Sequence, residues 1–235
     1  MQILFEEVEE EKQAIQGEYS SNNKDIENQK KKALEAIHRN AHRLQMLTKD
    51  ILDIAKIESR ALTLDKERFS LTQKIRSAIE DVVASETRKE PRSENKKIQI
   101  KFESKEGETD IFIDADKARI YQVISNLLKN AIKVVKEDGT ITITADVNRK
   151  KVAEGQERGG EQVVIVKVRD SGTGIDAHIL PILFTKFATS SCQGIGLGLF
   201  ISKNIIEAHG GRIWAENNHD GNGATFAFSL PCRTN

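Results

Sequence analysis

Three motifs follow one another in the second half of the chain: RIYQVISNLLKNAIK (119–133), DSGTG (170–174) and GIGLGLFISKNIIEAHGG (194–211). The first has apolar residues at helical spacing, and a strand-like run, VVIVKVRD (163–170), leads into the second. Glycine-rich loops and amphipathic helices are each common. Their succession in this order predicts a nucleotide-binding pocket.

The predicted helix over 116–136 begins at Asp116, which can cap it by accepting backbone N–H bonds. Asn126, Asn130 and Lys133 are four and three residues apart, so they share one face, while the apolar residues form another. An amide oxygen suits Mg²⁺, and a lysine can neutralise phosphate. Two asparagines on a helix are usually ordinary surface residues, and only the loops that follow favour a binding role.

In DSGTG, Asp170 ends an apolar strand, and its carboxylate can accept a hydrogen bond from the exocyclic amine of adenine. Gly172 and Gly174 allow the backbone to approach a flat ligand closely. A strand that ends in Asp-Ser-Gly is also an ordinary turn. The loop therefore indicates a base-binding site only together with its neighbours.

In GIGLGLF, closely spaced glycines precede a predicted helix over 197–209, an arrangement that directs backbone N–H groups and the positive end of the helix dipole toward phosphate. The glycines are Gly194, Gly196 and Gly198. The Gly-Lys-Ser/Thr of a Walker loop does not follow, and the spacing differs from a dinucleotide fingerprint.

Residues 1–64 contain a single glycine and no proline, and predict a helical domain. A stripe at spacings of three, four or seven consists of Leu34, Ile37, Ala41, Leu44, Ile51, Ala55 and Leu62. The polar stretch SSNNKD (20–25) predicts a turn and hence a helical hairpin. Two copies pairing into a four-helix bundle would cover the stripe, and docking of the hairpin on the second domain is the alternative.

Residues 65–235 alternate between predicted strands and helices. The strands are 97–104, 110–114, 140–147, 163–170, 211–217 and 224–230, and the further helix is 71–85. The fold class is therefore α+β, with an N-terminal helical hairpin followed by an α/β sandwich.

Composition narrows the possible partners. Lys plus Arg and Asp plus Glu both number 36, so no net charge favours nucleic acid or an anionic membrane. Two cysteines without metal-ligand spacing suit a reducing cytoplasm, and no apolar run approaches the roughly 20 residues of a membrane helix. We expect a cytoplasmic protein without membrane contact, which can be part of a larger protein.

With these residues in place, the chain resembles a sensor histidine kinase of two-component signalling, from about residue 25 to 231. Asn126 to Asn130 match the N box, DSGTG and GIGLGLF the two glycine boxes, and LFTKF (183–187) the F box. The segment 43–59 resembles the second dimerisation helix. The resemblance implies dimerisation helices joined to an ATP-binding domain of the gyrase, Hsp90, kinase and MutL type.

The resemblance implies ATP and Mg²⁺ as cofactors, with Asn130 as the metal ligand, Asp170 as the adenine-binding residue, and Asn126 and Lys133 as triphosphate contacts. The implied cofactor-binding set is Asn126, Asn130, Lys133, Asp170, Gly172, Gly174, Lys186, Gly194, Gly196, Gly198 and Leu199. Related ATPases carry a water-activating Glu at the position of Asn126, and an amide cannot take that proton. We therefore expect phosphoryl transfer to histidine and thence to a response regulator, in a homodimer formed by the N-terminal helices.

The phosphoacceptor signature of the family is missing. None of His38, His42, His178, His209 and His219 lies in a sequence of the expected type. We expect the chain to begin just after that signature, so the acceptor histidine lies outside it. The alternatives are a degenerate, nucleotide-gated dimeric signalling module and a serine/threonine kinase of the same nucleotide fold.

Overall fold

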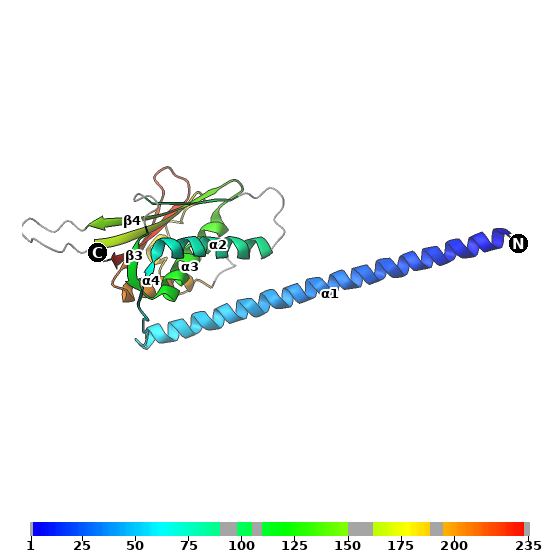
Figure 1. The fold of residues 1–235 in the computed structure, drawn as a ribbon, viewed down its shortest axis with the longest axis horizontal. Coiled ribbons are helices and arrows are strands. Elements are labelled where there is room, and N and C mark those ends of the chain that lie inside the picture. The colour runs from blue at the N-terminus through cyan, green and yellow to red at the C-terminus, as the bar shows by residue number, and fades with distance from the viewer. Residues whose placement is uncertain (1, 90–97, 105–109, 150–161, 189–194, 233–235) are drawn as a thin grey trace, which may run out of the picture. The chain divides into compact units, whose positions relative to one another are not determined.

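The computed structural model describes residues 2–89, 98–104, 110–149, 162–188 and 195–232. The chain forms two compact units, Met1–Leu52 and Asp53–Asn235. Helix α1 (Gln2–Glu58) makes up the first unit and contributes its last turns to the second (Figure 1). The assignment of 1–64 as a dimerisation domain and 65–235 as an ATP-binding domain stays a prediction.

The N-terminal segment is helical, as predicted, but it is one continuous helix of 57 residues. The predicted turn at 20–25 is corrected, because those residues lie inside α1. Serine and asparagine cost less than about 1 kcal/mol each relative to alanine in a helix, and the stretch contains neither glycine nor proline. Its polar composition therefore does not end the helix.

Every strand and helix predicted over residues 65–235 is present, most of them with shifted ends. The elements are β1 (Glu67–Ser70), α2 (Leu71–Lys89), β2 (Gln99–Glu103), β3 (Phe112–Ala115), α3 (Lys117–Val134), β4 (Thr140–Arg149), β5 (Gln162–Asp170), the 3₁₀ helix η1 (Leu180–Ile182), α4 (Gly198–Ala208), β6 (Arg212–Asn217) and β7 (Ala224–Cys232). Strand β1 was not predicted, because only one of its four residues has a large apolar side chain. It forms by antiparallel pairing with β3.

Five strands form one sheet in the order β2-β4-β5-β7-β6, parallel between β2 and β4 and antiparallel elsewhere. Helices α2, α3 and α4 lie together on one face of this sheet (Figure 1). The predicted α+β sandwich is confirmed. Alternation along β5 directs Val164, Val166 and Val168 into the core, and the same period places Asp170 on this buried face, opposite Ile141 of β4.

Helix α3 is fixed at its start by Asp116, as predicted. The Asp116 Oδ1 accepts hydrogen bonds from the backbone N–H groups of Ala118 (3.1 Å) and Arg119 (3.0 Å). The Asp116 N–H in turn donates to Nε2 of buried His209, 2.9 Å away at the end of α4. His209 Nδ1 lies 2.7 Å from the Ile205 carbonyl oxygen, and burial lowers the pKa of His209. The neutral imidazole thus connects the beginning of α3 to the end of α4.

The last turns of α1 are bound to α3 through a buried carboxylate. Arg119 donates from Nη1 to Asp53 Oδ1 at 2.7 Å, and Gln122 donates from Nε2 to Asp53 Oδ2 at 2.9 Å. Asp53 is only 3% exposed, so both oxygens are paired out of water. The first turns of α3 are therefore bonded both to α1 and to the end of α4.

Candidate functional site

The carboxyl group of Asp170 is buried at the end of β5, with 1% of the residue exposed. Its Oδ1 accepts hydrogen bonds from the N–H groups of Gly172 (2.8 Å) and Ala224 (3.3 Å). Its Oδ2 is buried and has no hydrogen-bond partner among the residues that the structure describes. Burial raises the pKa of Asp170, and the two N–H groups oppose this rise. An unpaired buried carboxylate oxygen is costly, which marks it as a candidate ligand contact.

The loop 170–174 packs against the end of α3. A Cβ on Gly172 would lie 2.8 Å from Val134 Cγ2 and 2.8 Å from Asp170 Oδ1, so no side chain fits there. Val134 is four residues after Asn130, on the same stripe of the helix. The half-buried amide of Asn130 is thus one helical turn from the loop that carries Asp170.

The second glycine motif contacts the other end of this stripe. Asn126 Nδ2 donates to Ser202 Oγ of α4 at 3.0 Å, and a Cβ on Gly198 would lie 2.4 Å from Asn126 Oδ1. Asn126, Asn130 and Val134 follow at intervals of four residues, along about 12 Å of helix. A nucleoside triphosphate can span such a length. Both glycine motifs are therefore brought to one face of α3.

The F box and the second glycine box are bonded to each other near the start of α4. Phe187 N–H donates to the Gly196 carbonyl oxygen at 3.0 Å, and Gly196 has a φ of 71°, which glycine tolerates best. Leu199 is half-buried in the first turn of α4. Gly194 lies outside the described residues.

The two candidate lysines differ in their surroundings. Lys133 is exposed near the end of α3. Lys186 forms an ion pair with Glu58, and its Nζ lies 5.3 Å from the ring centroid of Phe200. A role for Lys186 in binding phosphate therefore requires it to leave these partners.

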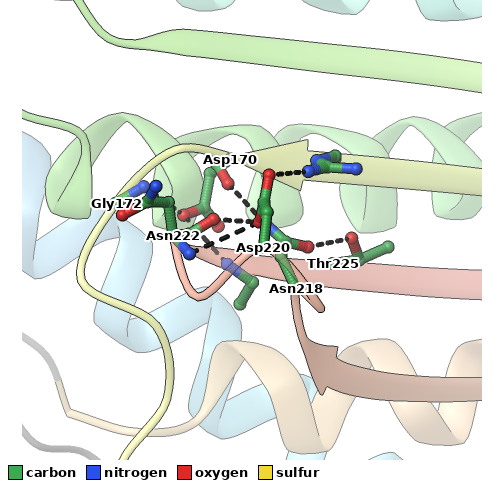
Figure 2. A network of polar contacts seen from close by, with 8 residues as sticks. Asp170, Gly172, Asn218, Asp220, Asn222 and Thr225 are labelled. Atoms are coloured by element: carbon green, nitrogen blue, oxygen red, sulfur yellow. Dashed lines mark hydrogen bonds and ion pairs between the residues drawn. The ribbon is translucent and has the colours of Figure 1, made fainter.

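The motifs did not point to the turn between β6 and β7, which lies directly against loop 170–174. A network of polar contacts joins Asp170 to Asn218, and Asn218 to Thr225 (Figure 2). The consecutive asparagines 217 and 218 before the sequence HDGNG predict only a turn. Sheet pairing between β5, β7 and β6 brings Asn218 to Asp170 and Asn217 to Ile175.

The sandwich, with its helices on one face, is the fold of histidine kinase ATP-binding domains. The model of the histidine kinase-, DNA gyrase B- and HSP90-like ATPase family matches residues 115–234. The chain therefore belongs to this family and contains a sensor histidine kinase catalytic domain.

Known relatives agree with this assignment. Sensor protein FixL of Bradyrhizobium diazoefficiens is 38% identical over 134 residues, which are 57% of this chain and 24% of FixL. The sensor histidine kinase WalK of Bacillus subtilis is 29% identical over 195 residues, 80% of this chain and 28% of WalK. The chain thus spans about a quarter of the length of these relatives.

A solved catalytic domain of the histidine kinase ThkA superimposes with a TM-score of 0.55 at 34% identity, covering 72% of this chain and 96% of that domain. No helix in the described part of the chain is long and apolar enough to cross a membrane.

The raised pKa of Asp170 predicts that the ionised carboxylate lowers the stability of the ligand-free protein. Because the folded state binds the proton more tightly than the unfolded state, the contribution of Asp170 is most favourable below the ordinary aspartate pKa of about 3.9 and is lost as pH rises through its raised pKa. For Asp170→Asn we expect an unfolding free energy at pH 7 no lower than that of the unaltered protein, and a difference that shrinks on acidification. Urea unfolding from pH 7 down to about pH 4, close to the ordinary aspartate pKa, measures both.

The exposed Asp138→Asn is the matched control, and its unfolding free energy should stay close to that of the unaltered protein. A difference for Asp170→Asn that stays constant across this pH range would contradict the expectation.

Proposed function

We propose that this chain is the kinase core of a sensor histidine kinase, which binds ATP with Mg²⁺ and directs its γ-phosphoryl group to a histidine and then to a response regulator. The observation that carries the proposal is the buried Oδ2 of Asp170, which has no hydrogen-bond partner among the described residues, in a loop that packs one helical turn of α3 from Asn130. Family membership supports ATP as the nucleotide.

Asp170 is proposed to select the base. Because Oδ1 is already bound to two backbone N–H groups, Oδ2 is left to accept from the exocyclic amine of adenine. Guanine carries a carbonyl oxygen at that place, which a carboxylate repels. Gly172 and Gly174 allow the loop to lie close to Val134 and Asn217, and they are proposed to line the base with their backbone. A solved structure of the histidine kinase ShkA contains AMPPNP, which supports an adenine nucleotide here.

The phosphate end is proposed to lie along α3 and the start of α4. Asn130 would offer its amide oxygen to Mg²⁺, and a single protein oxygen fits an ion that takes its other ligands from phosphates and water. When bound, the ion would neutralise phosphate charge. Further contacts are proposed from Asn126, Lys133, Lys186, Gly194, Gly196, Gly198 and Leu199.

Asn126 favours phosphoryl transfer over hydrolysis. Its amide donates to Ser202 and has no basic site that could take a proton from water. The attacking group then comes from another side chain, in this proposal a histidine. His209 does not fit that part, because both of its ring nitrogens are within hydrogen-bond distance of backbone groups. A solved complex of ThkA with the response regulator TrrA supports a response regulator as the final acceptor.

A homodimer is proposed to form through α1. Leu34, Ile37 and Leu44 are 67%, 64% and 64% exposed, and they recur at intervals of three and seven residues. Such a stripe is usually covered by a second helix, and a second copy of the chain presents the same stripe.

Mg²⁺-ATP should stabilise the protein against unfolding. At a concentration one hundred times the Kd, binding adds about 2.7 kcal/mol to the unfolding free energy, seen as a higher melting temperature. We expect Asp170→Asn to abolish the shift and Asn130→Ala to abolish only the part that depends on Mg²⁺. The exposed, remote Asn148→Ala serves as control and should keep the full shift. No shift at millimolar nucleotide would refute the ATP site.

The transferred phosphoryl group should be acid-labile. With γ-labelled ATP and a separate polypeptide that carries a histidine-kinase phosphoacceptor helix, we expect label on that polypeptide that is lost in acid and stable in alkali, as for phosphohistidine. Label that survives acid would favour the serine/threonine kinase, and nucleotide binding without label would favour the nucleotide-gated module.

Replacing Ile37 and Leu44 together by lysine should convert the dimer to a monomer, because like charges would meet in the apolar contact. Sedimentation equilibrium measures the mass. A control that places lysine at the exposed polar Asn40 should stay dimeric. A monomeric unaltered protein at tens of micromolar would contradict the proposal.

A further inference from the structure

Two consecutive asparagines at the end of β6 bind the two ends of loop 170–174. Asn218 is 8% exposed, and its Nδ2 donates to the Asp170 carbonyl oxygen at 2.9 Å and to the Asn222 carbonyl oxygen at 2.6 Å (Figure 2). Its Oδ1 accepts from Thr225 Oγ at 2.7 Å, which fixes the orientation of the amide. The amide of Asn218 therefore holds the main chain at the residue proposed to bind adenine.

Asn217 binds the other end of the loop in the manner of a neighbouring strand. Its Oδ1 accepts from the Ile175 N–H at 2.7 Å, and its Nδ2 donates to the Ile175 carbonyl oxygen at 2.9 Å. The amide thus satisfies both backbone groups of one residue. Asn217 also restricts which residue fits at position 174, because a Cβ on Gly174 would lie 3.0 Å from Asn217 Oδ1.

The turn between β6 and β7 leaves Asp170 little freedom. A Cβ on Gly223 would lie 2.0 Å from the Asp170 carbonyl oxygen and 2.7 Å from Gly172 N, so the two backbones are in direct contact. The Gly223 carbonyl oxygen accepts from the Asn218 N–H at 3.0 Å, and the next residue, Ala224, donates to Asp170 Oδ1. With the main chain and Oδ1 both held, Oδ2 has one available direction.

We propose that Asn217 and Asn218 are positioning residues which, by holding both ends of loop 170–174, set the preference of the pocket for adenine over guanine. The inference rests on the proposed ATP site. Discrimination between an amine and a carbonyl at one place on a purine requires a carboxylate that cannot move or turn away. If the loop is released, Asp170 can relieve its repulsion from guanine, and selectivity falls more than affinity.

The test is the ratio of the Kd values for Mg²⁺-GTP and Mg²⁺-ATP, measured by calorimetry on the whole chain. For Asn217→Ala and Asn218→Ala we expect this ratio to fall about tenfold, the worth of one well-placed hydrogen bond. Asn148→Ala, an asparagine at the far end of β4, is the control and should keep the ratio. Thr225→Val removes only the donor that orients the Asn218 amide, and should lower the ratio in the same direction.

A purely structural role predicts a lower melting temperature with both affinities reduced by the same factor, and that result would overturn the proposal. If Asn218→Ala does not fold, Asn217→Ala and Thr225→Val decide the matter by the same ratio. The two proposals fail differently: an unaltered protein that binds no ATP refutes the ATP site, whereas normal ATP preference with unchanged ratios in the variants refutes only the positioning role.

Discussion

The burial of the Asp170 carboxylate is the constraint on which the candidate site depends. Strand β5 alternates strictly, so a residue two places after Val168 must face the helices, whatever its chemistry. One of its oxygens accepts from backbone N–H groups of two different segments, and the other has no partner in the part of the chain that the structure describes. The fold therefore maintains a buried polar atom that it does not itself satisfy, a cost that proteins accept mainly where a ligand binds.

Helix α3 adds the other residues of the candidate site to the buried carboxylate of Asp170. Its apolar residues, such as Leu127 and Leu128, are fully buried, which fixes the rotation of the helix and leaves Asn126 and Asn130 on a half-buried face. Its start is bonded to the end of α4 through Asp116 and His209. Because both glycine motifs pack along the same stripe, small displacements of α3 would change the spacing between the parts proposed to bind base and phosphate.

Much of the fold could be predicted because its signals are local. The strands around Ile141 and Val166 alternate clearly, and Asp116 is followed at once by the apolar period of α3. The prediction of a turn at 20–25 was wrong because the polar residues there are also compatible with a helix. No glycine or proline in this stretch favours a turn over a helix. Strand β1 was not predicted because four residues are too short to show an alternating pattern. They form a strand only by pairing with β3.

The chain itself carries the motifs, their order and the chemistry of Asn130 and Asp170, since these depend on residue type and short spacing. Three features arise only on folding. One oxygen of Asp170 is left without a partner among the described residues, and Gly198 and Gly223 have no space for a side chain. Asn217 and Asn218 come to lie at the same site as Asp170. These relations join residues up to dozens of positions apart through sheet register and helix packing. No local pattern records contacts of that kind, because they exist only once the strands have paired.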